Sequence, residues 1–237
     1  HKGDMSSIKN RLKYIYAVAP RPYTSGTYAY IVSDETGIVS LPPLEQAEKM
    51  SFEQRIELSF KEALVKGLDF YFGVSVALVA IGERMSQRMN KIDIRSMLMQ
   101  PSAFFRILKG LIKSKIARRP LQPRDIWNLK GILSSGTDGT IFKESIRQAW
   151  GRYPLNIYAS TEAGIIATQA WDYGSMTFMP SANFLEFIPE EEYTRWQMDN
   201  SYMPRAVLLS ELNPGKRYEL VITNFHGGPL IRYRTGD

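Results

Sequence analysis

The residues with the clearest chemical potential form a short polar run that follows a predicted strand. Tyr158 to Glu162 provide an aromatic ring, a small residue, two hydroxyls and a carboxylate after the strand expected over 155–160. A hydroxyl can hydrogen-bond a phosphate oxygen, and a carboxylate suits Mg²⁺, which prefers oxygen ligands. Ligands of open α/β sheets gather at the carboxyl ends of strands. Taken alone, such a run is more often an ordinary strand-to-turn segment.

A second polar run closes the chain, from Thr223 to Asp237. It contains a Gly-rich turn and a short strand that leads to the acidic residue. A carboxylate there can accept two hydrogen bonds from a ribose diol, as acidic residues do in dinucleotide folds. The alternative is a β-turn closed by Gly236 and Asp237.

The elements that must position these runs predict an α/β fold. Strands are expected over 12–19, 131–134 and 155–160, and helices over 44–66, 103–117 and 141–150. Ser51 and Gln54 have the spacing of a capping box within the helix at 44–66. The apolar run at 68–82 fits a buried strand or a buried helix.

The order of these elements also predicts how the sheet is built. Strands that alternate with helices imply a mostly parallel sheet with crossover helices. From Met176 onward, short alternating segments between Pro and Gly turns predict antiparallel strands. We therefore expect an α/β sub-domain over 1–175 with acyl and adenine pocket elements, and a smaller antiparallel β sub-domain over 176–237.

Composition excludes several classes of function. The chain has 237 residues, 44% of them hydrophobic, which is enough for a buried core. It has no cysteine, so thiol catalysis, disulfides and cysteine metal sites are excluded. His1 and His226 lack the spacing of a helical zinc motif. The run at 68–82 is too short to span a bilayer and there is no signal-peptide pattern, so we expect a cytoplasmic protein without a membrane partner.

Basic residues give the chain a formal charge of +6, which would help to attract anionic nucleotides. The most basic stretch is Arg106 to Arg119, where lysines and arginines alternate with Phe104, Phe105, Ile107, Leu108, Leu111 and Ile112. We interpret it as an amphipathic helix with a solvated basic face. Contact with nucleic acid or a membrane surface is the alternative, and we expect no nucleic-acid partner.

The two polar runs together carry a family resemblance. YASTEAG at 158–164, followed by PLIRYRTGD at 229–237, resembles the adenylate-forming superfamily of acyl-coenzyme A synthetases, nonribosomal adenylation domains and luciferases. YAVAPRPYTSGTYAY, LPPLEQAEKMSFEQRI and LSSGTDGTIFKESIRQAW are most similar to the branch of plant auxin-responsive acyl-acid amido synthetases and their bacterial relatives. The resemblance covers most of the chain, and the two short motifs are its most specific part.

The resemblance implies a role for each matching residue. Tyr158 matches the aromatic that lies against adenine, Thr161 the hydroxyl near the α-phosphate, Glu162 the magnesium ligand and Asp237 the ribose-binding acid. Ala159 and Ser160 complete the nucleotide-binding motif. Ser135, Gly136 and Thr137 occupy the place of the glycine-containing loop that flanks adenine. Thr161 and Glu162 are the catalytic candidates.

The sequence also departs from the family pattern. Ala159 stands where glycine is commoner, so a positive φ there would be costly. The family's Gly-rich phosphate loop is missing. TSGT at 24–27 resembles it but lacks the following lysine, and GILSSG at 131–136 has the glycine spacing of a Walker motif without the required Lys. The chain ends at Asp237, before the small domain with the family's catalytic lysine. We therefore expect a fragment of the large N-terminal domain of such an enzyme, inactive alone.

The implied activity is that of a ligase. The parent enzyme would bind ATP, Mg²⁺ and a carboxylic acid, form an acyl-adenylate, and pass the acyl group to an amine such as an amino acid, or to coenzyme A. The products on the nucleotide side are AMP and pyrophosphate. Tyr23, Thr24, Phe70, Phe72 and Val76 are guesses at the wall of the acyl pocket, and fit a simple core equally well. The alternative function is a non-catalytic nucleotide-binding or interaction module that retains the fold.

Overall fold

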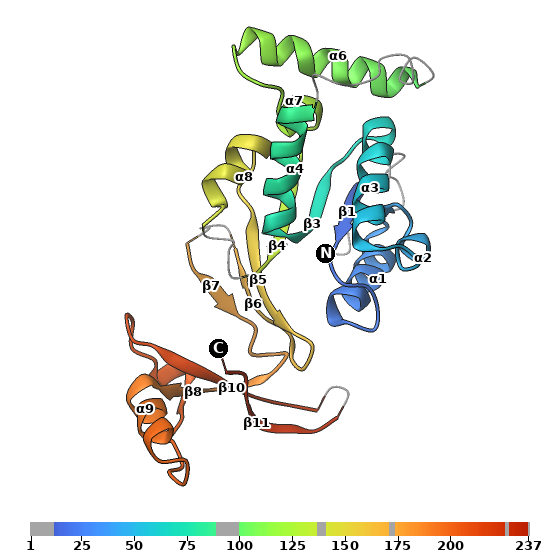
Figure 1. Ribbon diagram of the computed structural model, residues 1–237. Helices are drawn as coiled ribbons and strands as arrows, with labels where there is room; N and C mark the ends of the chain where they lie inside the picture. Colours follow the sequence, from blue (N-terminus) through green and yellow to red (C-terminus); the bar gives the residue numbers. More distant parts are fainter. Residues whose placement is uncertain (1–11, 89–99, 137–140, 171–173, 226–227, 237) are drawn as a thin grey trace. The chain divides into compact units, whose positions relative to one another are not determined.

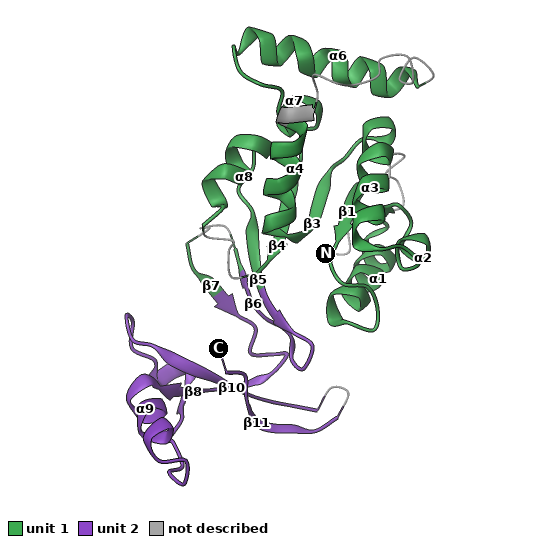
Figure 2. Ribbon diagram, in the orientation of Figure 1, with its two compact units in different colours: residues 1–157, 169–176 green, residues 158–168, 177–237 purple. Residues whose placement is uncertain are grey.

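The computed structural model describes residues 12–88, 100–136, 141–170, 174–225 and 228–236 (Figure 1). The chain divides into two compact units, which Figure 2 shows in different colours. Unit 1 comprises residues 1–157 and 169–176, and unit 2 comprises residues 158–168 and 177–237. The assignment of acyl and adenine elements to 1–175 and of the ribose motif to 176–237 stays a prediction.

A seven-stranded sheet and its helices occupy the first three quarters of the chain. In chain order the elements are β1 (Lys13–Ala17), α1 (Thr24–Thr36), β2 (Val39–Leu41), α2 (Leu44–Ala47), α3 (Phe52–Lys66), β3 (Phe70–Val74), α4 (Ser75–Arg88), α6 (Pro101–Ile116), α7 (Pro123–Ile126), β4 (Gly131–Ser135), α8 (Lys143–Trp150), β5 (Leu155–Ser160), β6 (Gly164–Gln169) and β7 (Met176–Phe178).

The strand order of this sheet is β2-β1-β3-β4-β5-β6-β7. Within unit 1, β1 pairs in parallel with β2 and β3, and β4 pairs in parallel with β3 and β5. Parallel neighbours require long crossover connections, and the helices between the strands provide them. The predicted mostly parallel sheet with crossover helices is confirmed.

Helices cover both faces of the parallel strands in unit 1. Ile15 and Ala17 of β1 belong to the larger hydrophobic cluster, together with residues of α3, α4, α6, α7 and α8. Tyr14 and Tyr16 belong to a second cluster with residues of α1 and α2. Successive residues of a strand point to opposite faces of the sheet, so each cluster fills one face. Unit 1 is therefore a three-layered α/β structure.

Two tryptophans anchor the larger cluster. The rings of Trp127 and Trp150 are stacked with their centroids 6.2 Å apart. Trp127 Nε1 donates to the carbonyl oxygen of Ala63 over 3.0 Å, and Trp150 Nε1 donates to that of Leu78 over 3.1 Å. Each indole thus buries its large apolar ring while its N–H stays hydrogen-bonded.

The capping box occurs at the start of α3 and not inside a longer helix. The Gln54 N–H donates to Ser51 Oγ over 3.3 Å, and the Ser51 N–H donates to Gln54 Oε1 over 3.1 Å. These bonds satisfy two N–H groups that lack partners at a helix start. The single helix expected over 44–66 is therefore wrong, since α2 and α3 are separate. The run at 68–82 contains both β3 and the start of α4.

Helix α1 was not among the expected helices, because Pro20, Pro22 and Gly26 are residue types that favour loops. Its apolar residues are mostly consecutive, at 28–32, so they lack the spacing of an amphipathic helix. Gly26 has a packing role here, since a Cβ at this position would lie 2.3 Å from the backbone N of Arg21. The glycine lets the first turn of α1 lie directly against the Pro-rich segment.

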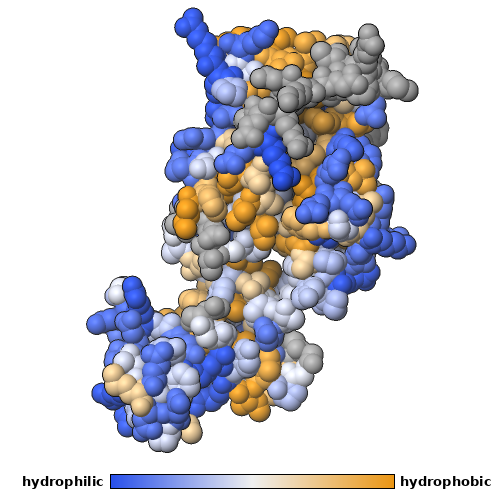
Figure 3. Space-filling model, viewed as in Figure 1, coloured by the Kyte–Doolittle hydropathy of each residue, from blue (hydrophilic) through white to orange (hydrophobic). Residues whose placement is uncertain are grey.

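The basic stretch forms α6, but the interpretation of its faces is wrong in two respects. The face that packs against α3 and α7 consists mainly of small residues, with Ala103, Ile107, Gly110 and Ser114 buried. Phe105, Leu108 and Ile112 are exposed, and Figure 3 shows apolar surface along the upper edge of unit 1, where Figure 1 places α6. Arg106 is only partly exposed, and its Nη1 donates to the carbonyl oxygens of Ala63 and Leu64 at the end of α3.

Unit 2 contains the second, antiparallel sheet. Its elements are β8 (Phe184–Pro189), α9 (Glu190–Met198), β9 (Val207–Leu208), the 3₁₀ helix η4 (Leu209–Glu211), β10 (Tyr218–Asn224) and β11 (Leu230–Arg234). The strand order is β11-β10-β8-β9, with antiparallel pairing throughout. The predicted antiparallel sheet from Met176 onward is confirmed, although β7 belongs to the first sheet and α9 was not expected.

No helix in the described part of the chain combines the length and the apolar composition needed to cross a bilayer.

Candidate functional site

The run Tyr158 to Glu162 lies on a tight hairpin. β5 ends at Ser160, residues Thr161–Ala163 form a turn, and β6 begins at Gly164. Gly164 has a φ of +67°, a left-handed conformation that favours glycine. A three-residue turn followed by a left-handed glycine is a common hairpin connection. The strand predicted over 155–160 is confirmed, and the turn at its carboxyl end presents the two catalytic candidates.

A hydrogen bond inside the turn fixes its shape. The Ala163 N–H donates to Ser160 Oγ over 3.1 Å. A serine hydroxyl has a second acceptor lone pair and its own O–H donor, so this bond leaves Ser160 able to donate. Thr161 and Glu162 are exposed at the tip of the hairpin. Ser160 thus shapes the turn from within, while the next two side chains face solvent.

Two buried asparagines, which the sequence analysis missed, hold the same turn from outside. Asn183 and Asn224 are each 4% exposed. Asn183 Nδ2 donates to the carbonyl oxygen of Ala163 over 3.0 Å, and Asn224 Nδ2 donates to that of Glu162 over 3.0 Å. In the sequence, one asparagine directly precedes β8 and the other ends β10. The two become neighbours only when these strands pair in the antiparallel register.

Tyr158 is half-buried among apolar residues of unit 2. It packs against the cluster of Ile166, Leu185, Phe187, Leu220 and Ile222. Ala159 is exposed, and the non-glycine residues with a positive φ in the described part of the chain are Arg118 and Arg232. Ala159 therefore occupies its position without the backbone strain that the replacement of glycine could have caused.

The predicted adenine loop begins in unit 1, after β4. Ser135 ends that strand and Gly136 follows with a φ of +119°, while Thr137 lies outside the described residues. A Cβ placed on Gly136 would have no heavy atom of the described residues within 4 Å. The preceding residue, Ser134, is buried and shares a short hydrogen bond with the hydroxyl of Ser75 at the start of α4. The backbone that leads into the loop is thus fixed to a helix start.

Asp237 also lies outside the described residues. β11 ends three residues earlier at Arg234, whose guanidinium is paired with both carboxylate oxygens of Glu219 over 2.8 and 2.5 Å. The Arg234 guanidinium carbon also lies 3.8 Å from the centroid of the Trp196 ring. Glu219 and Trp196 therefore hold Arg234, the cation nearest to Asp237 in the sequence, on the antiparallel sheet.

The exposed carboxylate of Glu162 fits a magnesium ligand chemically. Among the described residues, no hydrogen bond or ion pair to this carboxylate is found, so its oxygens remain available. The same part of the chain contains no group of three or more His, Cys, Asp or Glu side chains able to hold a metal ion. Mg²⁺ is commonly bound by one or two carboxylates together with substrate phosphates and waters, and a single exposed carboxylate suits that arrangement.

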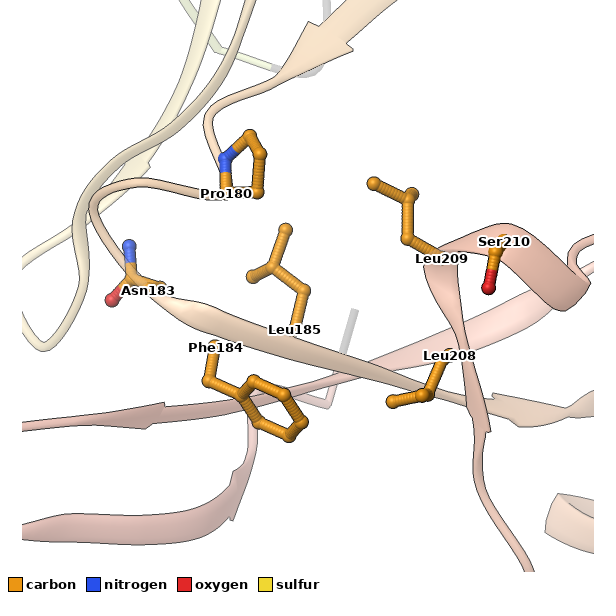
Figure 4. Close-up of a pocket in the computed structure, with 7 residues that line it drawn as sticks. All are labelled: Pro180, Asn183, Phe184, Leu185, Leu208, Leu209 and Ser210. Atoms are coloured by element: carbon orange, nitrogen blue, oxygen red, sulfur yellow. The ribbon is translucent and has the colours of Figure 1, made fainter.

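Unit 2 also contains an open pocket of about 420 Å³, shown in Figure 4. Its lining is largely apolar and consists of Pro180, Asn183, Phe184, Leu185, Leu208, Leu209 and Ser210. Asn183 therefore lies at the pocket wall while its amide is bonded to the turn at 161–163.

Among the guessed acyl-pocket residues of unit 1, Phe70 and Phe72 pack in the core, whereas Tyr23 and Val76 are more than half exposed, at 56% and 51%.

Comparisons with known proteins bear on this arrangement. A family model described as the GH3 family central domain matches residues 176–237. The probable indole-3-acetic acid-amido synthetase GH3.2 of Oryza sativa subsp. japonica is 38% identical over 63 residues, which are 27% of this chain and 10% of that protein.

A solved structure shares the fold at low sequence identity. It is an open conformation of 2-hydroxyisobutyryl-CoA ligase in complex with 2-HIB-AMP and CoA, with a TM-score of 0.59 and 14% identity. The match covers 96% of this chain and 40% of that chain, so this chain spans less than half of that ligase. Residues 176–237 are thus similar to the GH3 central domain, and the predicted resemblance to adenylate-forming enzymes, in the branch of the acyl-acid amido synthetases, is confirmed.

Proposed function

We propose that the full-length protein is a ligase that activates a carboxylic acid with ATP as an acyl-adenylate and then transfers the acyl group to an amine or a thiol. The observation that carries this proposal is the turn at 161–163. Thr161 and Glu162 are adjacent and exposed in it, while Ser160, Asn183 and Asn224 hold its backbone. A fixed backbone that presents exposed polar side chains is what a binding turn requires.

The reaction consists of two group transfers. A carboxylate oxygen of the acid forms a bond to the α-phosphorus of ATP, the bond from that phosphorus to the bridging oxygen breaks, and pyrophosphate leaves. An amine nitrogen or a thiolate sulfur then attacks the acyl carbon, and AMP leaves with the electrons of the broken carbon–oxygen bond. An amine loses a proton in this second step. The acceptor is an amino acid or coenzyme A.

The residues of this chain would bind and orient the nucleotide. Tyr158, with Ser135, Gly136 and Thr137, would contact adenine, and Asp237 would accept hydrogen bonds from the ribose hydroxyls. Thr161 would donate to an α-phosphate oxygen, and Ala159 and Ser160 would complete the motif. Glu162 would hold Mg²⁺, which supplies positive charge against the charge that develops on the phosphates.

Two substitutions in the full-length protein test these roles by different signatures. Glu162→Gln should slow adenylation and raise the Mg²⁺ concentration required, because an amide oxygen is a neutral and weaker ligand. Asp237→Ala should mainly weaken AMP binding, by about 1.5 to 3 kcal/mol if hydrogen bonds to a charged acceptor are lost. Kinetics against ATP and Mg²⁺, with calorimetric AMP titration, separate the two. Wild-type behaviour of both variants would remove the site assignment.

A further inference from the structure

We propose that Asn183 and Asn224 are positioning residues, which hold the backbone of Glu162 and Ala163 so that the Glu162 carboxylate is presented in one orientation. This inference rests on the proposed function of Glu162. Neither asparagine touches the reacting groups in this proposal. Each acts through the turn at 161–163, which lies within unit 2 together with both asparagines.

The two amides form a continuous chain of hydrogen bonds. Asn224 Nδ2 donates to Asn183 Oδ1 over 2.9 Å and to the Glu162 carbonyl oxygen over 3.0 Å. Asn183 Nδ2 in turn donates to the Ala163 carbonyl oxygen over 3.0 Å. A flipped Asn224 amide would place Oδ1 against two oxygens, so the network itself determines the orientation of both side chains.

The antiparallel register explains why these two residues meet. β8 and β10 pair up to Thr223 opposite Phe184. Continued by one step, this register brings Asn224, the last residue of β10, to Asn183, which directly precedes β8, in agreement with the hydrogen bond between their side chains. The turn is thereby tied to the end of β10 and to the residue that directly precedes β8.

The network also has an energetic cost that favours a specific role. Asn224 Oδ1 is buried and has no hydrogen-bond partner among the described residues. An unpaired buried acceptor is unfavourable, and apolar residues of similar size would fill this space without it. The hydrogen bond from Asn224 Nδ2 to the Glu162 carbonyl oxygen explains why an asparagine, and not an apolar residue, occupies position 224.

The most informative substitution is Asn224→Asp, which keeps the shape of the side chain. A carboxylate oxygen would replace Nδ2 and face the oxygens of Glu162 and Asn183, so the contact changes from attraction to repulsion. In the full-length protein we expect a fall of tenfold or more in the adenylation rate, with a higher Mg²⁺ requirement. Asn183→Ala should have a smaller effect of the same kind, because it removes the bonds of Asn183 to Ala163 and to Asn224 but leaves the bond from Asn224 Nδ2 to Glu162 in place and introduces no repulsion. If Asn224→Asp does not fold, Asn183→Ala takes its place in the cycle.

The matched control is Ile188→Val. Ile188 is buried on β8 at 2% exposure but lies outside the cluster that packs against Tyr158. Its loss of one methylene should lower stability without a change in the Mg²⁺ requirement. Hydrogen exchange of the peptide that spans 158–166 should be faster in Asn224→Asp and unchanged in the control.

The deciding experiment is a double-mutant cycle that combines Asn224→Asp with Glu162→Gln. The adenylation rate and the half-saturating Mg²⁺ concentration are measured for each variant, at a temperature well below the melting temperatures of all variants. If Asn224 acts through Glu162, Asn224→Asp should add less than about twofold in the Glu162→Gln background. Additive effects, or an unchanged Asn224→Asp enzyme beside an impaired Glu162→Gln enzyme, would overturn the positioning role and leave the proposed function intact. A fully active Glu162→Gln enzyme would overturn the proposed role of Glu162, and the positioning role with it.

Discussion

Arg119 and Asp125 form a bidentate ion pair that closes the connection between α6 and α7. Arg119 Nη1 and Nη2 donate to the two carboxylate oxygens of Asp125 over 2.7 and 2.8 Å. The Gln122 N–H also donates to this carboxylate, over 3.0 Å. Asp125 is 5% exposed. A buried carboxylate with three donors stabilises the fold only while it is ionised.

The pH dependence of stability should reveal this pair. Burial raises the pKa of Asp125, but the hydrogen bonds from Arg119 and Gln122 outweigh it and hold the pKa below its ordinary value. Because the folded-state pKa lies below that of the unfolded chain, near 3.9, the stabilisation is present at neutral pH and is lost as the pH falls through the folded-state pKa.

We expect Asp125→Asn to lower the free energy of unfolding by about 1.5 to 3 kcal/mol at pH 7, with a smaller loss below about pH 4. Urea unfolding from pH 7 to pH 3 measures both effects. Glu57→Gln is the control, because Glu57 is 70% exposed in its pair with Lys61 and such pairs contribute little. Equal pH profiles for Asp125→Asn and wild type would contradict this interpretation of the pair.

Arg106 should also matter for stability. Its Nη1 donates to the carbonyl oxygens of Ala63 and Leu64 over 3.1 and 2.5 Å, near the end of α3, where the helix dipole favours a cation. The Ala63 carbonyl oxygen also accepts from the Gly67 N–H and from Trp127 Nε1. We expect Arg106→Met to cost about 1.5 to 3 kcal/mol, since a charged donor is lost from a half-buried site. Lys113→Met, an exposed position on the same helix, should change stability by less than about 0.5 kcal/mol. Similar losses for the two variants in chemical unfolding would contradict the capping role.

The exposed lysines of α6 should have little influence on nucleotide affinity. Lys109, Lys113 and Lys115 are all exposed, and charges in solvent are screened within about 10 Å at 0.1 M salt. We expect the triple substitution to Gln in the full-length protein to change the dissociation constant of AMP by less than about twofold. Calorimetric titration at 0.1 M salt measures this constant. A tenfold loss of AMP affinity would contradict the expectation and assign a binding role to this helix.

Much of the fold could be predicted from the sequence where local signals were strong. The strand over 155–160, the capping residues Ser51 and Gln54, and the antiparallel segments after Met176 all have clear periodicity or cap chemistry. Helix α1 was missed because it lacks an amphipathic pattern, and the close approach of Gly26 to the backbone of Pro20 and Arg21 gives no periodic signal in the sequence. The faces of α6 were assigned wrongly because its buried side is made of small residues such as Gly110 and Ser114.

The site could be predicted only where its residues are adjacent in the sequence. Residues that share a short motif, such as Thr161 and Glu162, are adjacent in sequence and can be recognised together. Asn183 and Asn224 contact the same turn from positions 41 residues apart in the chain. Their meeting depends on the register of β8 and β10, which local sequence does not specify.

The central claim is that the full-length protein activates a carboxylic acid through its adenylate, with Glu162 in the site. The most direct test is ATP–pyrophosphate exchange by the purified full-length protein across a panel of aryl, fatty and indole acids. We predict that at least one acid stimulates exchange in the presence of Mg²⁺, and that Glu162→Gln lowers the stimulated rate tenfold or more while AMP still binds. A protein that binds AMP but shows no acid-dependent exchange, with an active enzyme as positive control, would contradict the claim.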